Sequence, residues 1–80
     1  MLRCKVRGAC VATIKNRQIT GISLISVERL DNAEQLVAAD PFGCPPGALV
    51  LVASGSAARL ALSNPQAPID HAVVAIVDEE

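Results

Sequence analysis

Hydrophobic and polar residues alternate along the first part of the chain. Arg3, Lys5 and Arg7 occupy every second position, and the positions between them are apolar. Side chains of a β-strand point alternately to its two faces, so this pattern predicts a strand over residues 2–13 with one basic face. Gly8 interrupts the middle of this strand, where a glycine is typical of a bulge or a sharp bend.

Four further segments have the composition of strands. Residues 22–30 mix alternation with short apolar pairs, which suits a strand buried on much of both faces. Residues 49–53 are apolar without alternation, which indicates a central or buried strand. Shorter strands are predicted over residues 35–39 and 70–77. Residues 14–20 are polar, and we expect them to form a loop.

The segment between the third and fourth strands reads Asp-Pro-Phe-Gly-Cys-Pro-Pro-Gly over residues 40–47. Three prolines and two glycines in so short a stretch exclude regular strand pairing, so we expect a loop. At its start, Asp40 is expected to bond the backbone ahead of it. We expect Phe42 to fold back onto the core and anchor the loop.

One helix is predicted, over residues 57–62, because this segment is rich in good helix formers. Ser54 or Ser56 is expected to cap it, and Asn64 and Pro65 are expected to end it. The N–H groups of its first turn could hold an anion, although this signal is weak because every capped helix has such groups.

Together these elements predict a mainly β protein, a small five-stranded OB-like barrel with one short helix before the last strand. Residues 1–80 are expected to form a single domain. A chain of this length buries only about 60% of the surface of its unfolded form, so it needs a further source of stability. Hydrophobic residues make up 51% of the sequence, yet Phe42 is its one aromatic. We therefore expect apolar surface between subunits.

The cysteines give little support to a disulfide or a metal site. Cys4, Cys10 and Cys44 are an odd number, and His71 is the one histidine. No pair of cysteines has the spacing of a zinc knuckle. We expect small buried thiols, no metal and no cofactor.

Candidate chemistry is sparse. A hydrolase needs a nucleophile with a base within reach, and nothing in the sequence ties Cys44 or Ser56 to His71. We expect an exposed or capping His71 and no enzyme. The net charge of -1 gives no electrostatic case for nucleic acid. The alternative is an OB-type nucleic-acid- or ligand-binding module, which would need exposed aromatics or a convergent polar site.

The first residues lack the pattern of a secretory signal, because charges interrupt them. No apolar run approaches the length needed to cross a bilayer. We expect a soluble, cytoplasmic protein.

Several segments are similar, in their order and spacing, to those of one protein family. They are Val-Ala-Thr at the end of residues 6–13, Val-Ala-Ala-Asp at 37–40, Gly-Ser-Ala-Ala-Arg at 55–59, Pro-Ile-Asp at 68–70 and Val-Ala-Ile-Val-Asp at 74–78. On these segments the chain resembles the EutN/CcmL family, the pentameric vertex proteins of carboxysomes and of ethanolamine- and propanediol-type microcompartments. The chain departs from the family at Ala57, which replaces the second serine of a Gly-Ser-Ser-Ala-Arg element.

The resemblance implies a structural shell protein in the bacterial cytoplasm. Family members form homopentamers that plug the fivefold corners of a polyhedral shell. Their implied partners are hexameric and trimeric shell proteins of the same compartment, with no nucleic acid and no membrane. We expect the subunit interface or axial pore to contain Gly55, Ser56, Ala57, Arg59 and Asp78, with Arg59 and Asp78 as a salt bridge. The sequence does not identify the type of compartment.

Overall fold

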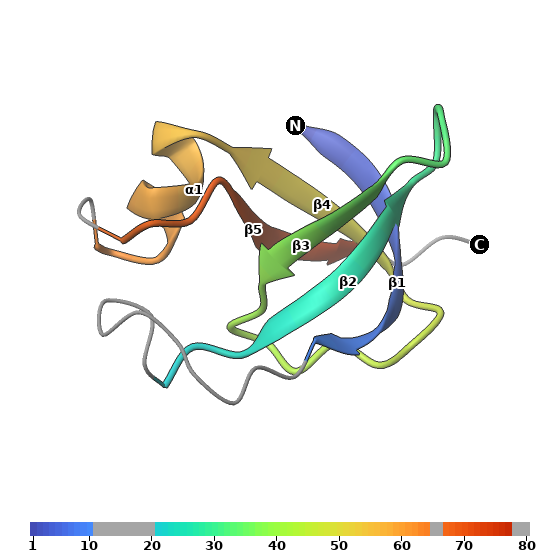
Figure 1. Ribbon diagram of the computed structural model, residues 1–80, viewed down its shortest axis with the longest axis horizontal. Coiled ribbons are helices and arrows are strands. Elements are labelled where there is room, and N and C mark those ends of the chain that lie inside the picture. The colour runs from blue at the N-terminus through green and yellow to red at the C-terminus, as the bar shows by residue number, and fades with distance from the viewer. Residues whose placement is uncertain (11–20, 65–66, 78–80) are drawn as a thin grey trace.

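The computed structural model describes residues 1–10, 21–64 and 67–77, which form five strands and one short helix (Figure 1). The elements are β1 (Leu2–Cys10), β2 (Leu24–Arg29), β3 (Gln35–Ala39), β4 (Leu49–Ser54), α1 (Ser56–Ala61) and β5 (His71–Val77). Their type and order are as predicted. The predicted end of the first strand, residues 11–13, and the loop at residues 14–20 lie outside the described residues.

The strands close into a barrel in the order β1-β2-β3-β5-β4. All neighbours are antiparallel except β3 and β5, which are parallel and paired only at Ala39 and Ala72. α1 lies at one end of the barrel, beside the end of β4 and the start of β5 (Figure 1). The predicted OB-like barrel, with one helix before the last strand, is therefore confirmed.

A bulge bends β1 where the sequence predicts one. Val6 pairs with Val27 and Gly8 pairs with Ser26, so Arg7 is an extra residue between two consecutive pairs. An extra residue in one strand increases the local bend and twist, which closing a small barrel requires. β5 has a second irregularity of this kind opposite β4.

Aliphatic and cysteine side chains form the core in two clusters. The larger fills the barrel with Cys4, Val6, Ile25, Val27, Ala38, Cys44, Val50, Val52 and Val73. The smaller lies between α1 and the end of the barrel, with Ala39, Ala58, Ala67, Ile69 and Ala72. Neither cluster contains an aromatic ring, so the buried apolar area per residue is small and the monomer has little reserve of stability.

The barrel corrects the expectation for one of the two apolar strands. In β2, Ile25 and Val27 are buried while the residues beside them are half-buried, and β4 alternates in the same way from Leu49 to Val52. Only one face of a barrel strand meets the interior, so the predicted burial on both faces is wrong for β2. β4 pairs with β1 and β5 on its two edges, so its predicted central position is confirmed. Among the described residues, no helix is long and apolar enough to span a membrane.

The prediction that Phe42 anchors the 40–47 loop is also wrong. The Phe42 side chain is 54% exposed, whereas Cys44 is buried against the main cluster. The turn that Asp40 organises directs the small thiol inward and leaves the larger ring outside.

Candidate assembly site at the helix end of the barrel

The turn from β4 into α1 is made by Gly55. Its φ of 62° and ψ of -137° lie in a region that side chains with a Cβ rarely adopt. The Gly55 N–H donates a hydrogen bond of 2.7 Å to the carbonyl oxygen of Asp70. This bond fastens the turn to the residue before β5 and so sets where α1 begins.

α1 presents one buried residue and an exposed surface of small side chains. Ala58 is fully buried in the smaller cluster, while Ser56, Ala57 and Ala61 are exposed. The N-cap residue is Gly55, and no side chain caps the helix. The predicted cap by Ser54 or Ser56 is therefore wrong, and a six-residue helix of this kind offers no defined anion site.

Arg59 ties the helix to the segment that leads into β5. Its Nη1 donates to the carbonyl oxygen of Ile69 at 3.3 Å and lies 4.0 Å from a carboxylate oxygen of Asp70. The Asp70 side chain is 85% exposed, so this ion pair contributes little to stability. The expected partner of Arg59, Asp78, lies outside the described residues.

Ser54 and His71 form a polar pair that sequence reasoning missed. They are cross-strand neighbours of β4 and β5, and Ser54 Oγ lies 3.1 Å from His71 Nδ1. No spacing in the sequence could reveal the pair, because it depends on strand register. A hydroxyl beside an imidazole is also the start of a nucleophile–base pair, but catalysis needs a third group that orients the base. Within the part of the chain that the structure describes, His71 has no such partner.

A second polar cluster closes the 40–47 loop around Asp40. Its buried carboxylate accepts hydrogen bonds from the N–H groups of Phe42 at 3.0 Å, Gly43 at 3.2 Å and Cys44 at 2.7 Å. The Cys44 thiol donates to the same carboxylate, with Sγ 3.2 Å from Oδ1. This confirms the predicted turn and accounts for the burial of Asp40.

Asp40 and Cys44 shift each other's pKa values. Burial alone would raise the pKa of Asp40, but the hydrogen bonds from Cys44, Phe42 and Gly43 outweigh it and hold that pKa below its ordinary value. Burial, followed by the bond to Asp40, raises the pKa of Cys44 to about 11. The thiol is therefore protonated at neutral pH and suits a structural role, not a nucleophilic one.

Four of the five residues expected at an interface or pore thus lie together. Gly55, Ser56, Ala57 and Arg59 all belong to α1 or the turn before it, at one end of the barrel. Ser56 and Ala57 are exposed there, whereas Gly55 and Arg59 are half-buried. Among the described residues, no group of three or more His, Cys, Asp or Glu side chains could hold a metal ion.

Comparison with known proteins identifies similar chains. A model of the EutN_CcmL family, described as "Ethanolamine utilisation protein EutN/carboxysome", matches residues 1–78. The carboxysome shell vertex protein CcmL of Nostoc sp. strain PCC 7120 is 42% identical in an alignment that covers 92% of this chain and 79% of that protein.

Solved structures extend the similarity to the whole fold. The pentameric microcompartment shell protein GrpN from Rhodospirillum rubrum superimposes with a TM-score of 0.87 and 37% identity, over 99% of this chain and 95% of that one. A structure described as the ethanolamine utilization protein EutN gives a TM-score of 0.94 and 34% identity, over 100% of this chain and 88% of that one.

Proposed function

The chain belongs to the EutN/CcmL family of microcompartment shell vertex proteins, and from this premise we propose that five copies form a ring that closes a fivefold corner of a shell. The observation that carries the proposal is the match over residues 1–78, joined to the fold shared with a pentameric shell protein. The protein is a structural shell component and not an enzyme. Its place is the microcompartment shell, within the bacterial cytoplasm.

The composition of the barrel supports assembly. Its core is aliphatic and small, and among the described residues six large hydrophobic side chains are exposed: Met1, Leu30, Val37, Phe42, Leu60 and Ile76. A ring of five identical chains needs two different surfaces on each chain that fit one another. Association would bury part of this apolar surface and supply the stability that the monomer lacks.

We further propose that residues 1–80 act as one vertex domain and that α1 and its preceding turn lie where neighbouring chains meet. Ser56 and Ala57 support this, because small exposed side chains allow close approach around an axis. Gly55 and Arg59 lie beside them and are proposed to belong to the same junction. Asp78 is proposed to join them as an acidic partner. The hexameric and trimeric proteins of the same shell are the proposed neighbours of the ring, and we propose that no cofactor or nucleic acid takes part.

The alternative, an OB-type nucleic-acid- or ligand-binding module, has less support. Such modules stack bases on several aromatic side chains in a basic groove. This chain has one aromatic residue and a net charge of -1.

The mass of the native protein tests the proposal. The purified chain is expected to have five times the 8.3 kDa mass of one polypeptide, measured by native mass spectrometry and by light scattering. A folded, long-lived monomer, a dimer or a hexamer under the same conditions would contradict it.

A further inference from the structure

The C-terminal half of β5 is apolar on both faces of the strand. Ala75 pairs with Leu51 and Val77 pairs with Leu49, on the outside of the barrel. Ile76 pairs with Val50, which is buried. Even so, Ile76 is 50% exposed, and its two neighbours are only half-buried. A strand in a barrel wall ordinarily has a polar outer face. This segment is therefore built to be covered on both sides.

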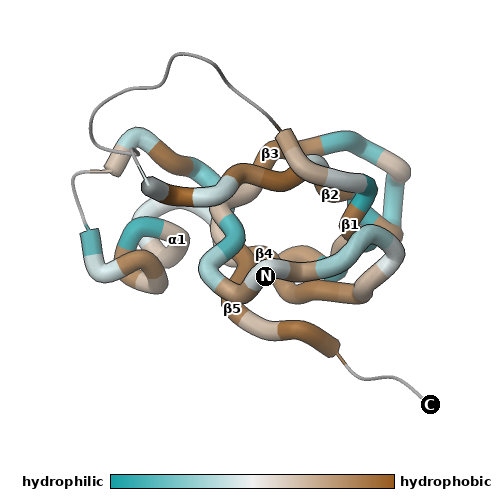
Figure 2. The backbone as a smooth tube through the Cα atoms, turned by 90° about the horizontal axis from the view of Figure 1, so that it is seen from below, coloured by the Kyte–Doolittle hydropathy of each residue, from teal (hydrophilic) through white to brown (hydrophobic). Residues whose placement is uncertain are grey.

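One backbone edge of the same segment has no strand partner among residues 1–10, 21–64 and 67–77. β5 pairs with β4 along its length, but within the described residues its other edge meets β3 at Ala72 alone. Natural proteins protect such edges with charged side chains or proline, and residues 72–77 contain neither. Figure 2 shows the end of β5, coloured as hydrophobic, leading away from the ring of strands. We call this C-terminal half of β5, residues 74–77, the arm.

A matching surface lies at the corresponding edge of β3, which pairs with β5 only through Ala39. A pocket of about 260 Å³ opens there, lined by Leu24, Val37, Ala39, Pro68, Ile69, Asp70 and His71. Five of these seven residues are apolar, and Val37 is 49% exposed. The pocket thus combines an unpaired strand edge with an apolar cavity, which together suit an incoming extended segment.

We propose that the arm of one chain docks at the β3 edge of the next chain in the ring, with Ile76 in this pocket. The inference rests on the pentamer proposed above and names the surfaces that form it. The arm and the pocket are different parts of one chain, so the contact is head to tail, as a closed ring requires. The occupant is a second copy, because the similar shell protein GrpN is pentameric and a closed ring needs two unlike surfaces on each chain.

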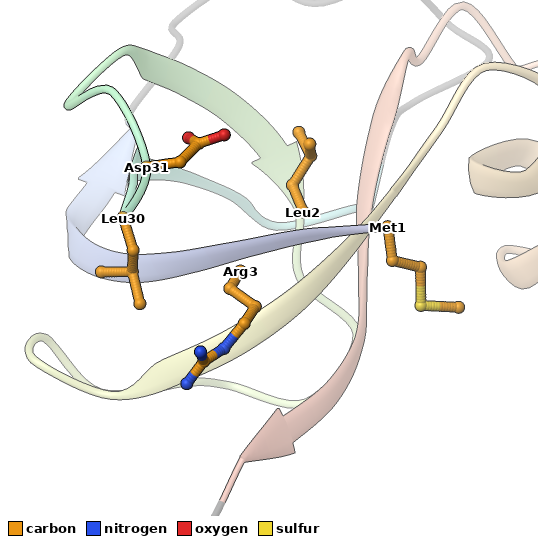
Figure 3. A pocket seen from close by; sticks show the side chains of 5 residues that line it. All are labelled: Met1, Leu2, Arg3, Leu30 and Asp31. Carbon is orange, nitrogen blue, oxygen red and sulfur yellow. The ribbon is translucent and has the colours of Figure 1, made fainter.

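A larger pocket elsewhere fits the arm less well. It measures about 400 Å³ and is lined by Met1, Leu2, Arg3, Leu30 and Asp31 (Figure 3). In that view the Arg3 and Asp31 side chains point to opposite sides of β1. Docking an aliphatic arm beside these two charges would remove them from water at a cost, whereas the β3 pocket has mainly apolar walls.

A disulfide cross-link tests the contact directly. In the double variant Val37→Cys, Ile76→Cys, catalysed oxidation is expected to join neighbouring chains, because a disulfide forms only between residues whose Cα atoms lie within about 7 Å. A ladder of covalent species up to five chains should appear on a denaturing gel without reductant. The two single variants and the unsubstituted chain control for Cys4, Cys10 and Cys44, and none of them should give the ladder.

A charged residue in the arm gives a second, independent test. Ile76→Glu is expected to lose the pentamer and leave a folded species of one chain's mass, whereas Leu30→Glu, at a residue that is 46% exposed in the turn after β2, should remain pentameric. Circular dichroism checks the fold of both, and if Ile76→Glu does not fold, the cross-link alone decides. A pentameric Ile76→Glu variant, or a double-cysteine pentamer that yields only monomers on oxidation, would overturn the inference while leaving the proposed function intact. If the unsubstituted chain is not a pentamer, the proposed function itself fails.

Discussion

Asp40 is the one buried charged side chain among the described residues, and its position shows how a single residue organises a loop. Its carboxylate collects three backbone N–H bonds and one thiol bond from the four residues that follow it. Hydrogen bonds to a charged acceptor are stronger than neutral ones, and leaving such donors unsatisfied in a buried site is costly. The proline-rich loop is therefore held by local chemistry more than by apolar packing.

We predict that Asp40→Asn lowers the free energy of unfolding by about 2 kcal/mol at neutral pH, because the neutral amide is a weaker acceptor for these donors. Urea unfolding at a fixed protein concentration measures the effect. Glu34→Gln is the matched control, since the Glu34 side chain is 54% exposed and makes only a surface ion pair with Arg29. The control should change stability by less than about 1 kcal/mol.

The pH dependence of stability follows from the direction in which the pKa of Asp40 shifts on folding. Its pKa in the folded chain is lower than in the unfolded chain, so the unfolded state binds the proton more tightly. The contribution of Asp40 to stability is complete above the unfolded pKa of about 3.9 and is lost as the pH falls through the folded value. Between pH 6 and pH 3 the unsubstituted chain should therefore lose more stability than Asp40→Asn. Equal losses in the two proteins would contradict this assignment.

At the scale of elements, α1 is too short to be stable alone and owes its place to its neighbours. The Gly55 turn, the bond from Gly55 to Asp70 and the Arg59 contact with Ile69 fix it to the start of β5. Only Ala58 enters the core. The rest of the helix surface is therefore free to serve assembly without a cost to the fold.

We predict that Ala57→Trp weakens the pentamer, because a bulky ring would crowd the junction at which this end of α1 is proposed to meet its neighbours. Ala9→Trp, at an exposed alanine of β1, is the matched control. Native mass spectrometry over a dilution series should show Ala57→Trp dissociating at a concentration at least tenfold higher than the control. Equal dissociation of the two variants would place the junction elsewhere.

At the scale of the whole molecule, the barrel is a small aliphatic structure with apolar side chains left outside. Its two core clusters contain alanine, valine, isoleucine and cysteine only. Burial of such small side chains yields less stabilisation than burial of aromatic rings. Folding and association are therefore expected to be linked.

We predict that the melting temperature of the protein rises with its concentration. Association of folded chains stabilises each chain by mass action, by about 2 kcal/mol for a hundredfold increase in concentration. For a chain of this length this shifts the melting temperature by about 10 °C. Differential scanning calorimetry at two concentrations measures the shift, which Ile76→Glu should abolish. A melting temperature independent of concentration in the unsubstituted chain would show that the monomer carries its own stability.

The sequence by itself determined the elements and much of their chemistry. Local signals suffice to define strands, loops and a bulge. In this chain they are the alternation in residues 2–10, the prolines of residues 40–47 and Gly8. The turn at Asp40 was predictable for the same reason, because all of its partners lie within four residues. The family resemblance also rests on segments in order along the chain.

Only the tertiary structure decided which distant residues meet. The Ser54–His71 pair depends on the register between β4 and β5, and the burial of Cys44 in place of Phe42 depends on where the Asp40 turn points. The apolar arm and the β3 pocket exist because β3 and β5 pair at one residue and then separate. Register and strand separation are set by the closing of the whole barrel, so no local pattern of residues could specify them.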